Sequence, residues 1–442
     1  EVLDKKIRQT KAAKMKYQEN RNYATEADQN DPLAVYRDKF YIPQHHGKDC
    51  IYLTGNSLGL QPKTVEKFID QELSDWKTLA VEGHLKSQNR PWFHYHKFSK
   101  DALAELVGAK PEEVVSMNNL TSNLHLMMVS FYRPKGNRFK IMIEGGAFPS
   151  DQYAVESQIK FHGYDYQKAL IELEPKEGED TLKTEDIIQK IKKYGNELAL
   201  VLLPGVQYFT GQWFDIKAIT AAAHAMGVLI GFDLAHAIGN VPLKLHDDDV
   251  DFAVWCSYKY LNSGPGGVSG IFVHERFSND QTLPRFAGWW GHNERERFKM
   301  KKGFLPMTGA DGWQLSNVNV LGTTAHLASL EIFSEVGMTS VREKSINLTG
   351  YLEFLLNSIN SEKLRVLTPI HPNERGCQLS ILVQKGKEVF EELTKKGVIA
   401  DWREPHLPGQ GGVIRVAPVP LYNSFTDIYN FYELLKKALD EG

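Results

Sequence analysis

The stretch Val228-Leu-Ile-Gly-Phe-Asp233-Leu-Ala-His236-Ala decides how this chain folds. Its first five residues are apolar or glycine, which predicts a strand buried on both faces of a sheet. The strand ends in Asp233, and His236 follows three residues later. Because an unpaired buried charge is costly, the Asp233 carboxylate needs a partner. Two interpretations stay open: the aspartate caps the next helix, or it faces the protonated ring nitrogen of a bound heterocycle.

Apolar runs of this kind alternate with helical patterns from Ile51 to about Leu330, which is typical of a mostly parallel sheet covered by helices. The expected strands are Phe139–Glu144, Leu198–Leu203, Val228–Asp233, Phe252–Ser257 and Ser269–Val273. One intervening helix is clear, because Asp215 is a suitable cap and Gly227 a suitable end. Its apolar stripe consists of Ile216, Ile219, Ala222, Ala223 and Met226. This part of the chain is therefore expected to be an α/β domain.

The pattern changes from about Ala325, where a long helical stretch (325–336 and 341–358) begins. The strand-like segments that follow are Arg365–Leu367, Cys377–Val383 and Gly412–Ala417, flanked by helical Lys387–Lys396 and Thr426–Leu439. This order predicts a second, smaller α+β domain. We therefore divide the chain into an N-terminal helical arm (1–50), a large α/β domain (51–325) and a small C-terminal domain (326–442).

The overall composition is that of an ordinary globular protein. Its 442 residues are 42% hydrophobic and 24% charged, with a formal net charge of -3. This balance favours neither nucleic acid nor an acidic membrane surface as a partner, and no apolar run has the roughly 18–20 residues of a membrane span. A solvated helix or a frayed arm is expected where basic residues concentrate at the start of the chain, namely Lys5, Lys6, Arg8, Lys11, Lys14, Lys16 and Arg21.

The three cysteines, Cys50, Cys256 and Cys377, follow no disulfide or zinc-binding spacing. We therefore predict no metal site and expect a reducing, cytoplasmic compartment. The chain begins at Glu1 rather than Met, which leaves open a processed or truncated N-terminus and a lost targeting segment.

Lys259 follows another apolar run and precedes the turn Gly264-Pro-Gly-Gly267. A lysine there lies at the carboxyl end of a buried strand, where open α/β sheets bind their ligands. Its amine can attach a carbonyl cofactor covalently, although most lysines are simply solvated at the surface. Lys259 follows Asp233 by 26 residues, one strand–helix–strand step, so both side chains are expected in one crevice. Together they favour pyridoxal phosphate, whose ring withdraws electrons only while its nitrogen stays protonated.

A phosphate group needs a cluster of hydrogen-bond donors. The polar run Asn118–Asn123, which contains Thr121, opens an apolar helix whose free N–H groups and dipole attract an anion. The segment Ala147–Tyr153 follows a strand and offers Phe148 to stack on a flat ring, with Asp151 behind it. Both segments also fit a simpler interpretation as an ordinary helix cap and an ordinary turn.

Three further segments are candidates for ligand contacts. The loop Tyr52–Pro62 holds two glycines and ends in a proline that opens a helix. Trp289 and Trp290 are adjacent, flanked by glycines and outside any periodic run, which favours a ligand wall or a subunit interface over core packing. Arg415 is a charge inside an apolar strand, and such an arginine pairs with a carboxylate of the protein or of a substrate.

These motifs resemble the fold-type I pyridoxal-phosphate enzymes, and among them the kynureninases. The resemblance covers the chain from about residue 35 to its end. Its most specific runs are Leu53–Pro62, Phe148–Asp151, Gly231–Ala237, Trp255–Asn262, Glu374–Ser380 and Ile414–Phe425. It implies a transferase-like α/β fold with a mostly parallel large domain and a smaller α+β C-terminal domain.

The resemblance also implies roles for individual residues. Lys259 would hold the cofactor covalently, and Asp233 would contact its ring nitrogen. The full cofactor set that it implies is Leu120, Thr121, Phe148, Pro149, Ser150, Asp151, Pro204, Asp233, His236, Tyr258, Lys259, Trp289 and Asn317. The implied substrate set is Ser57, His84, Trp290, Asn317 and Arg415, with Arg415 on the substrate carboxylate. Trp289 and Asn317 would reach the site from the partner subunit of a homodimer.

Three positions depart from the family pattern. Compared with one member of the family, Pro204 replaces a small polar residue, Phe209 a tyrosine and Trp290 a phenylalanine. If residue 204 touches the phosphate, only its backbone serves here. Trp290 is expected to narrow the aromatic pocket and to shift the preference between substituted and unsubstituted substrates.

The activity implied is hydrolysis of L-kynurenine or 3-hydroxy-L-kynurenine to anthranilate or 3-hydroxyanthranilate plus L-alanine, with Lys259 and Tyr258 as catalytic residues. One rival is another lyase of this fold, such as a cysteine desulfurase, although Cys256 and Cys377 resemble packing residues rather than mobile nucleophiles. An aminotransferase and a non-catalytic binding protein are further alternatives. The chain keeps its lysine, aspartate and arginine, which argues against the last.

Overall fold

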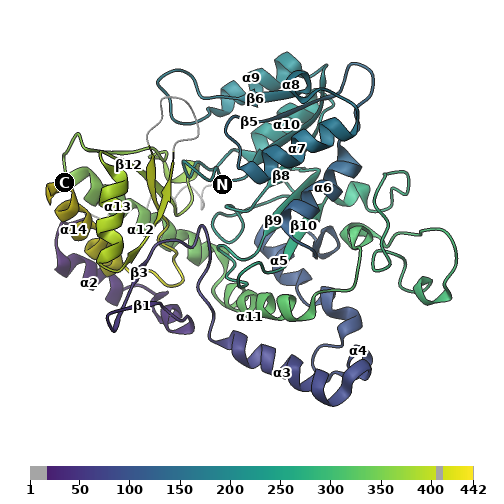
Figure 1. The fold of residues 1–442 in the computed structure, drawn as a ribbon, viewed down its shortest axis with the longest axis horizontal. Helices are drawn as coiled ribbons and strands as arrows, with labels where there is room; N and C mark the ends of the chain where they lie inside the picture. The colour runs from purple at the N-terminus through teal and green to yellow at the C-terminus, as the bar shows by residue number, and fades with distance from the viewer. Residues whose placement is uncertain (1–16, 405–411, 442) are drawn as a thin grey trace, which may run out of the picture.

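The computed structural model describes residues 17–404 and 412–441, in which helices pack around a large and a small sheet (Figure 1). Of the basic N-terminal residues only Arg21 is described, and it begins helix α2 (Arg21–Gln29). The expected basic arm otherwise lies outside the described residues: Lys5, Lys6, Arg8, Lys11, Lys14 and Lys16. No helix in the described ranges combines the length and apolar composition needed to cross a bilayer.

Within the described residues, the large sheet has seven strands in the order β4-β10-β9-β8-β7-β5-β6. They are β4 (Val114–Ser116), β5 (Lys140–Glu144), β6 (Leu170–Leu173), β7 (Leu198–Pro204), β8 (Leu229–Asp233), β9 (Phe252–Cys256) and β10 (Ser269–Val273). Neighbours from β6 to β9 pair in parallel, whereas β10 pairs antiparallel with β9 and β4. The five expected strands and the mostly parallel sheet are confirmed; the short strands β4 and β6 were not predicted.

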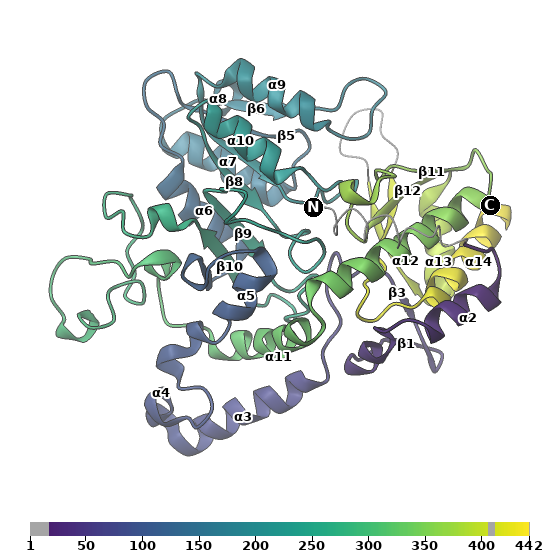
Figure 2. The same cartoon turned by 180° about the vertical axis from the view of Figure 1, so that it is seen from behind.

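The central strands are buried on both faces because helices cover each side. Leu200 and Leu202 of β7 pack into the cluster that includes α6 (Leu120–Phe131) and α7 (Pro149–Phe161). The intervening Val201 and Leu203 belong to the opposite cluster, with α9 (Thr184–Tyr194) and α10 (Ile216–Ala225). Figure 2 shows α9 and α10 on the side of the sheet away from α7. Successive side chains of a strand point to opposite faces, so two covered faces require a continuously apolar run.

Helix α10 confirms the prediction made from its caps. The Asp215 carboxylate accepts a hydrogen bond of 2.9 Å from the Ala218 N–H, which satisfies one of the free donors of the first turn. Gly227 follows the helix with a φ of 65°, a backbone conformation that favours glycine.

The connection from β8 to β9 differs from the expected strand–helix–strand step. Residues 234–251 form turns and contain no α-helix. The run Gly239-Asn-Val-Pro242 explains the difference, since Gly239 has a φ of 74° and the proline cannot continue a helix. The Asn240 side chain instead donates to the His236 carbonyl and accepts from the Cys377 N–H, which ties these turns to the C-terminal part of the chain.

The small sheet is antiparallel and has the order β11-β12-β15-β14. Its strands are β11 (Leu364–Val366), β12 (Leu379–Val383), β14 (Asp401–Arg403) and β15 (Val413–Val416). The helices around it are α12 (Met338–Ser358), α13 (Gly386–Lys395) and α14 (Phe425–Glu441). The expected α+β arrangement is confirmed, and β14 was not predicted. A further pair, β13 (Val398–Ile399) with β3 (Ile51–Tyr52), joins this part to the N-terminal segment.

Helix α2 of the N-terminal segment packs along α14 (Figure 2), where the Asp28 carboxylate accepts from the Phe425 N–H at 2.6 Å. The residue 325/326 boundary falls inside α11 (Val320–Val336), so the division into an arm and two domains remains our proposal. The other helices and strands are β1 (Gln44–His45), β2 (Lys48–Asp49), α3 (Thr64–Leu79), α4 (Gly83–Lys86), α5 (Lys100–Val107) and α8 (Tyr166–Ala169).

Candidate active site

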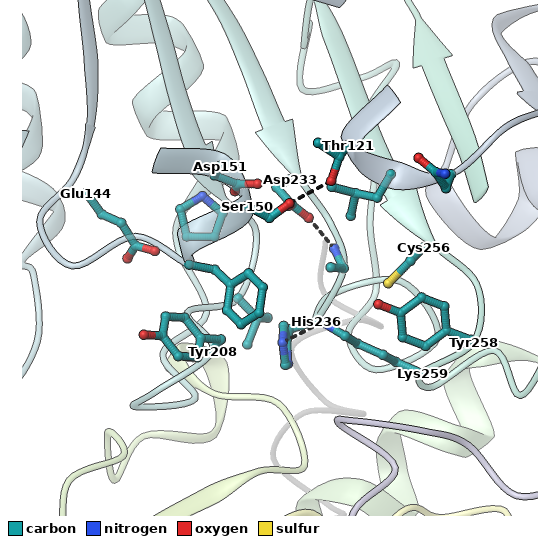
Figure 3. Close-up of a pocket in the computed structure, with 16 residues that line it drawn as sticks. Thr121, Glu144, Ser150, Asp151, Tyr208, Asp233, His236, Cys256, Tyr258 and Lys259 are labelled. Atoms are coloured by element: carbon teal, nitrogen blue, oxygen red, sulfur yellow. Dashed lines mark hydrogen bonds between the residues drawn. The ribbon is translucent and has the colours of Figure 1, made fainter. Parts of the chain in front are cut away.

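A pocket lies at the carboxyl ends of β8 and β9, between the first turns of α6 and α7 (Figure 3). It encloses about 710 Å³, part of which is open to solvent, a size typical of small-molecule sites. Its lining residues are Asn119, Leu120, Thr121, Glu144, Phe148, Ser150, Asp151, Pro204, Val206, Tyr208, Asp233, Ala235, His236, Cys256, Tyr258 and Lys259. Ten of these residues belong to the cofactor-binding set that the sequence predicted, so most of that set lines one pocket.

Lys259 and Asp233 share this pocket because their strands are neighbours. Asp233 is the last residue of β8, and Lys259 follows the end of β9 by three residues. The two strands pair in parallel, so their carboxyl ends meet at one edge of the sheet. The Lys259 Nζ lies 2.8 Å from the His236 Nε2 (Figure 3). The expectation of a common crevice was right, although no helix lies between the strands.

His236 is buried and neutral in this arrangement. Its pKa lies well below the usual value, chiefly because burial disfavours the imidazolium and then because Lys259 and Arg415 add positive charge nearby. A neutral Nε2 can accept a hydrogen bond from the Lys259 ammonium, which leaves the proton on Nδ1. The Nδ1 atom is buried and has no hydrogen-bond partner within the described residues. An unsatisfied buried donor at a pocket wall indicates a place for a ligand acceptor.

Three carboxyl groups gather at the other side of the pocket: Glu144 at the end of β5, Asp151 on α7, and Asp233 (Figure 3). Burial raises the pKa of Glu144 to about 8. Burial and then the negative charge of Asp233 raise the pKa of Asp151 well above its usual value, so Asp151 keeps its proton and donates to Asp233. Burial also raises the pKa of Asp233, but the Ala235 N–H at 2.7 Å and the Lys259 charge oppose this. Asp233 is therefore the carboxyl group best placed to be ionised.

The first turns of α6 and α7 form a cluster of donors for an anion. The Asn119 side chain caps α6 by accepting from the Ser122 N–H at 3.1 Å. The Thr121 and Ser150 hydroxyl groups, one from each helix, lie 2.7 Å apart and face the pocket. Free N–H groups at helix N-termini attract phosphate. Two converging N-termini with two hydroxyl groups support the predicted phosphate site.

Two aromatic side chains flank the lysine. The Phe148 ring centre lies 5.8 Å from the Lys259 Nζ, and 40% of this residue is exposed, so one face of the ring is free to stack on a ligand. Tyr258 lies beside Cys256 (Figure 3), and burial raises the pKa of the Tyr258 phenol, which keeps it protonated. A protonated phenol at the pocket wall can donate a hydrogen bond or a proton.

Sequence reasoning missed several lining residues, namely Asn119, Glu144, Val206, Tyr208, Ala235 and Cys256. Glu144 had a signal, because it is the charged last residue of a predicted strand next to the strands that end in the pocket. Tyr208 had none, since it sits in the turns after β7 and reaches the pocket only through the fold. Its ring stands edge-on to Phe148, at 5.2 Å between ring centres and 83° between planes.

Seven predicted site residues do not line this pocket within the described chain: Pro149, Ser57, His84, Trp289, Trp290, Asn317 and Arg415. His84 and Trp290 belong to a separate aromatic group, where each stacks on Phe93 at 4.8 and 5.9 Å between ring centres. Trp290 is fully buried and Trp289 is 44% exposed. Phe93 and the Arg297 guanidinium cover the faces of Trp290 within its own chain, and its place in a ligand wall or a subunit interface stays a prediction. Trp289 remains free to contact a partner.

Arg415 pairs with a carboxylate of the protein, and its contact with a substrate carboxylate stays a prediction. It is 1% exposed, forms an ion pair with Asp401 and donates to the Tyr208 carbonyl at 2.6 Å. The carboxylate partner seen here is thus the protein's own. Because Tyr208 also lines the pocket, Arg415 lies directly behind the pocket wall.

Comparison with known proteins shows which family the chain resembles. The family description "Kynureninase C-terminal domain" matches residues 341–435. A kynureninase of Flavobacterium psychrophilum is 52% identical over 432 residues, which cover 97% of this chain and 100% of that protein. The chain belongs to the kynureninase family. This membership agrees with the resemblance noted in the sequence motifs.

The kynureninase fold of this chain also resembles solved structures of other enzymes. An apo cysteine desulfurase from Thermococcus onnurineus has a TM-score of 0.74 at 17% identity and covers 95% of this chain and 98% of its own. A K223A mutant of C-DES, described with glycine covalently linked to its PLP cofactor, has a TM-score of 0.73 at 16% identity, with coverage of 87% and 96%. At such low identity the likeness shows the fold alone, and it confirms the fold-type I class.

Proposed function

We propose that this chain is a pyridoxal-phosphate-dependent hydrolase that cleaves the Cβ–Cγ bond of L-kynurenine, 3-hydroxy-L-kynurenine or both, giving anthranilate or 3-hydroxyanthranilate and L-alanine. The observation that carries the proposal is that Lys259, Asp233 and His236 meet in one buried pocket of a kynureninase-family chain. The rival desulfurase activity needs a mobile cysteine, whereas Cys50, Cys256 and Cys377 are all buried.

The pocket residues fit pyridoxal phosphate. Lys259 would hold its carbonyl carbon, Asp233 its ring nitrogen, and the α6 N-terminus with Thr121 and Ser150 its phosphate. The buried Asp151 Oδ1 and His236 Nδ1 have no partners within the described residues, and the polar edge of such a ring would satisfy them. When bound, this cofactor supplies an electron-withdrawing ring that stabilises negative charge at the substrate Cα.

Lys259 is the candidate for moving the proton at Cα. Lys259 lines the pocket, and the His236 Nε2, 2.8 Å from the Lys259 Nζ, holds this amine by accepting a hydrogen bond. Asp233 would face the ring nitrogen with a negative charge, which Asp151 stabilises by donating a hydrogen bond to the Asp233 carboxylate. Positioned acid–base groups of this kind typically contribute about 10²–10⁴-fold to a rate.

Tyr258 is the candidate for protonating the substrate Cβ when the Cβ–Cγ bond breaks. Its phenol stays protonated because burial raises its pKa. A donor with a proton available at neutral pH is what a carbanion leaving group requires. The same hydroxyl group is within the pocket that holds the phosphate donors, so a role in phosphate binding is compatible with the geometry.

Substrate recognition is assigned to the residues around the pocket mouth. Arg415 is proposed to bind the substrate carboxylate by exchanging its contact with Asp401, since a guanidinium pairs bidentately with carboxylates. Ser57, His84, Trp290 and Asn317 are proposed to contact the aromatic ketone.

We also infer a homodimer in the cytoplasm. The segment between β10 and α11 projects from the body of the molecule (Figure 1) and exposes large apolar side chains: Phe286, Trp289, Phe298, Met300 and Leu305. Exposed apolar groups gathered on one segment are typical of a subunit interface. Trp289 of a second copy would then complete the pocket. Free, buried cysteines support a reducing compartment.

The deciding experiment replaces Lys259. Lys259→Ala is expected to abolish the visible absorbance of bound cofactor and to lower kcat/KM for kynurenine by about 10²–10⁴-fold or more. The matched control is Lys190→Ala on the exposed surface of α9, which should change neither. Undiminished turnover of kynurenine by Lys259→Ala would exclude the assignment, and sulfide release from cysteine by the wild type would favour the desulfurase.

A further inference from the structure

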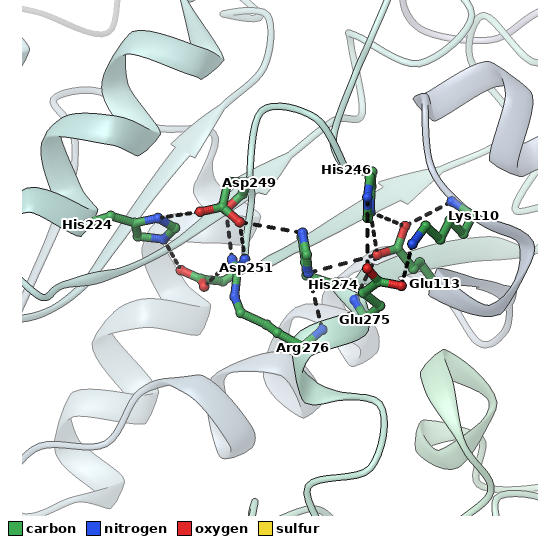
Figure 4. Close-up of polar contacts among 9 residues, drawn as sticks. All are labelled: Lys110, Glu113, His224, His246, Asp249, Asp251, His274, Glu275 and Arg276. Carbon is green, nitrogen blue, oxygen red and sulfur yellow. Dashed lines mark hydrogen bonds and ion pairs between the residues drawn. The ribbon is translucent and has the colours of Figure 1, made fainter.

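A second cluster of ionisable side chains lies at the opposite end of the large sheet from Lys259 (Figure 4). Strand β9 runs from Phe252 to Cys256, so Asp251 precedes its start while Lys259 follows its end. The antiparallel neighbour β10 ends at Val273, and the His274 N–H bonds to the Asp251 carbonyl. The cluster consists of Lys110, Glu113, His224, His246, Asp249, Asp251, His274, Glu275 and Arg276.

Glu113 is the centre of one half of this cluster. Its side chain is fully buried, and two backbone N–H groups hold it: Lys110 donates to Oε2 at 2.8 Å and Glu275 donates to Oε1 at 2.7 Å. The carboxylate is thus oriented by two segments of the chain, its own turn and the turn after β10. Such backbone hydrogen bonds are the outer contacts that fix a metal-binding carboxylate.

Both histidines direct the same ring atom to Glu113. The Nδ1 atoms of His246 and His274 lie 2.9 and 3.9 Å from its Oε1. Each Nε2 faces another acid, with Glu275 4.0 Å from His246 and Asp249 3.5 Å from His274. A histidine whose outer nitrogen donates to a carboxylate presents its inner nitrogen to a metal ion, an arrangement that recurs in metalloproteins.

The charges of the cluster leave a place for a dication. Its four carboxylates, on Glu113, Asp249, Asp251 and Glu275, face two permanent cations, Lys110 and Arg276. Two negative charges therefore remain for an ion or for protonated histidines to balance. The three candidate ligand atoms, one each from Glu113, His246 and His274, lie within 4.8 Å of one another. Bonds of about 2.0–2.1 Å to one ion bring such atoms to roughly 3.3 Å apart, so small side-chain movements suffice.

We propose that Glu113, His246 and His274 form a binding site for a divalent transition-metal ion of the zinc class. Two imidazoles with one carboxylate favour zinc over calcium or magnesium, which prefer ligand sets made of oxygen alone. Solvent reaches the site past His246 and Glu275, whose side chains are 25% and 41% exposed, so an ion can enter. The site joins the turn before β4, the loop before β9 and the turn after β10, and its role is to stabilise that end of the sheet.

Ion binding requires one local rearrangement. The His246 and His274 rings are stacked at 4.9 Å between centres and 14° between planes, and the His274 Nδ1 accepts from the Arg276 N–H at 3.2 Å. For both Nδ1 lone pairs to meet at one ion, the His274 ring turns out of this stack and gives up that hydrogen bond.

The test measures zinc bound to the intact enzyme with its cofactor in place. The wild type is incubated with zinc chloride, passed through gel filtration and analysed for metal by mass spectrometry; one zinc ion per chain is expected. His246→Gln and His274→Gln should each lose this zinc, and Glu275→Gln should weaken binding by about tenfold through the outer contact. His224→Gln is the matched control, because His224 contacts only Asp249 and Asp251 in this network and should leave zinc binding intact.

Two results would overturn the site. One is a wild type that retains no zinc, and the other is equal zinc retention by the wild type, His246→Gln and His274→Gln, which would indicate binding at other groups. If His274→Gln fails to fold, zinc retention is compared between the wild type and His246→Gln alone, because His246 is partly exposed. A zinc-dependent rise in Tm of the wild type that both glutamine variants lose is the independent readout.

Discussion

Three carboxyl groups, on Asp233, Asp151 and Glu144, line the candidate active site together with Lys259. The groups that surround each carboxyl differ. Asp233 receives the Ala235 N–H and faces Lys259, which favours its ionised form. Burial raises the pKa of Glu144 and outweighs the hydrogen bond from Gln207, which favours its ionised form. Burial likewise raises the pKa of Asp151 and outweighs the charge of Lys259, which favours ionisation. A single negative charge at the ring-nitrogen position is what the proposed chemistry needs. The protonation of these three groups is a property of residue environments rather than of residue types.

Glu144→Gln tests this description. The pKa of Glu144 is raised to about 8 in the folded state, so the folded chain binds a proton that the unfolded chain has lost, and wild-type stability falls as pH rises from the usual carboxyl range towards 8. Glutamine removes this dependence without changing the shape of the side chain. As pH rises from the usual carboxyl range towards 8, the free energy of unfolding of the variant should increase relative to that of the wild type by up to about 1.4 kcal/mol per pH unit.

The measurement is urea denaturation of both proteins at several pH values across the window. Parallel pH profiles for variant and wild type would show that Glu144 is ionised in the folded protein, contrary to expectation.

At the scale of elements, the turn that carries Lys259 is held from outside by the loop Tyr52–Pro62. The Gly59 N–H donates to the Tyr258 carbonyl at 2.8 Å, one residue before the lysine. A Cβ at Gly59 would lie 2.3 Å from the Lys259 carbonyl oxygen and 2.2 Å from the Asn262 Oδ1. Asn262 itself has a φ of 51°, so this turn has little freedom to adjust. The glycine is therefore required by the close approach of two backbones.

Gly59→Ala should displace the turn and with it the Lys259 amine. We expect a loss of kcat/KM of about 10²-fold, since a misplacement of roughly 1 Å costs that much, together with a shifted absorbance of the bound cofactor. Gly136→Ala is the control for backbone strain away from the pocket: the φ of 58° at Gly136 disfavours an alanine, but the residue does not line the pocket, so stability should fall while kcat/KM and the spectrum stay unchanged. Unchanged kinetics and spectrum in Gly59→Ala would mean that the loop Tyr52–Pro62 moves and the turn that carries Lys259 does not.

At the scale of the whole molecule, one chain builds the cofactor end of the pocket and leaves other predicted residues elsewhere. Asn317 lies at a separate cavity with Asn118 and Asn119, on the far side of the α6 N-terminus. Trp289 is exposed on the projecting segment. The positions of Asn317 and Trp289 are those expected if the segment between β10 and α11 of a second copy packs against this chain. The homodimer is thus a proposal that concerns how the active site is completed.

Hybrid dimers test it. Lys259→Ala and Asn317→Ala chains are each expected to be inactive, but a co-expressed mixture should regain about a quarter of wild-type activity, because about half of randomly paired dimers hold one intact site. The control mixture of Lys259→Ala with Asp233→Ala should regain none, because both residues belong to the same chain's pocket. No recovery in the first mixture, with hybrids present by mass, would place Asn317 in its own chain's site.

The sequence predicted the elements with a strong period and clear ends. Strands β5, β7, β8, β9 and β10 and helix α10 lie within a residue or two of their expected bounds. Among the strands of three or four residues, β11 and β15 were predicted, whereas β4, β6 and β14 were missed, since so few residues give only a weak pattern. The helix expected between β8 and β9 was wrong because glycine and proline interrupt residues 234–251.

By itself the sequence determined that Lys259 and Asp233 stand at the ends of buried strands, because apolar runs and their polar ends are local properties of the chain. Tertiary structure alone decided that the Lys259 Nζ meets His236, that Arg415 pairs with Asp401, and that Glu144 keeps its proton. It also decided that Glu113, His246 and His274 converge, although a search for cysteine spacing predicted no metal site. Distances between distant segments and the burial of a charge arise only when the chain has packed.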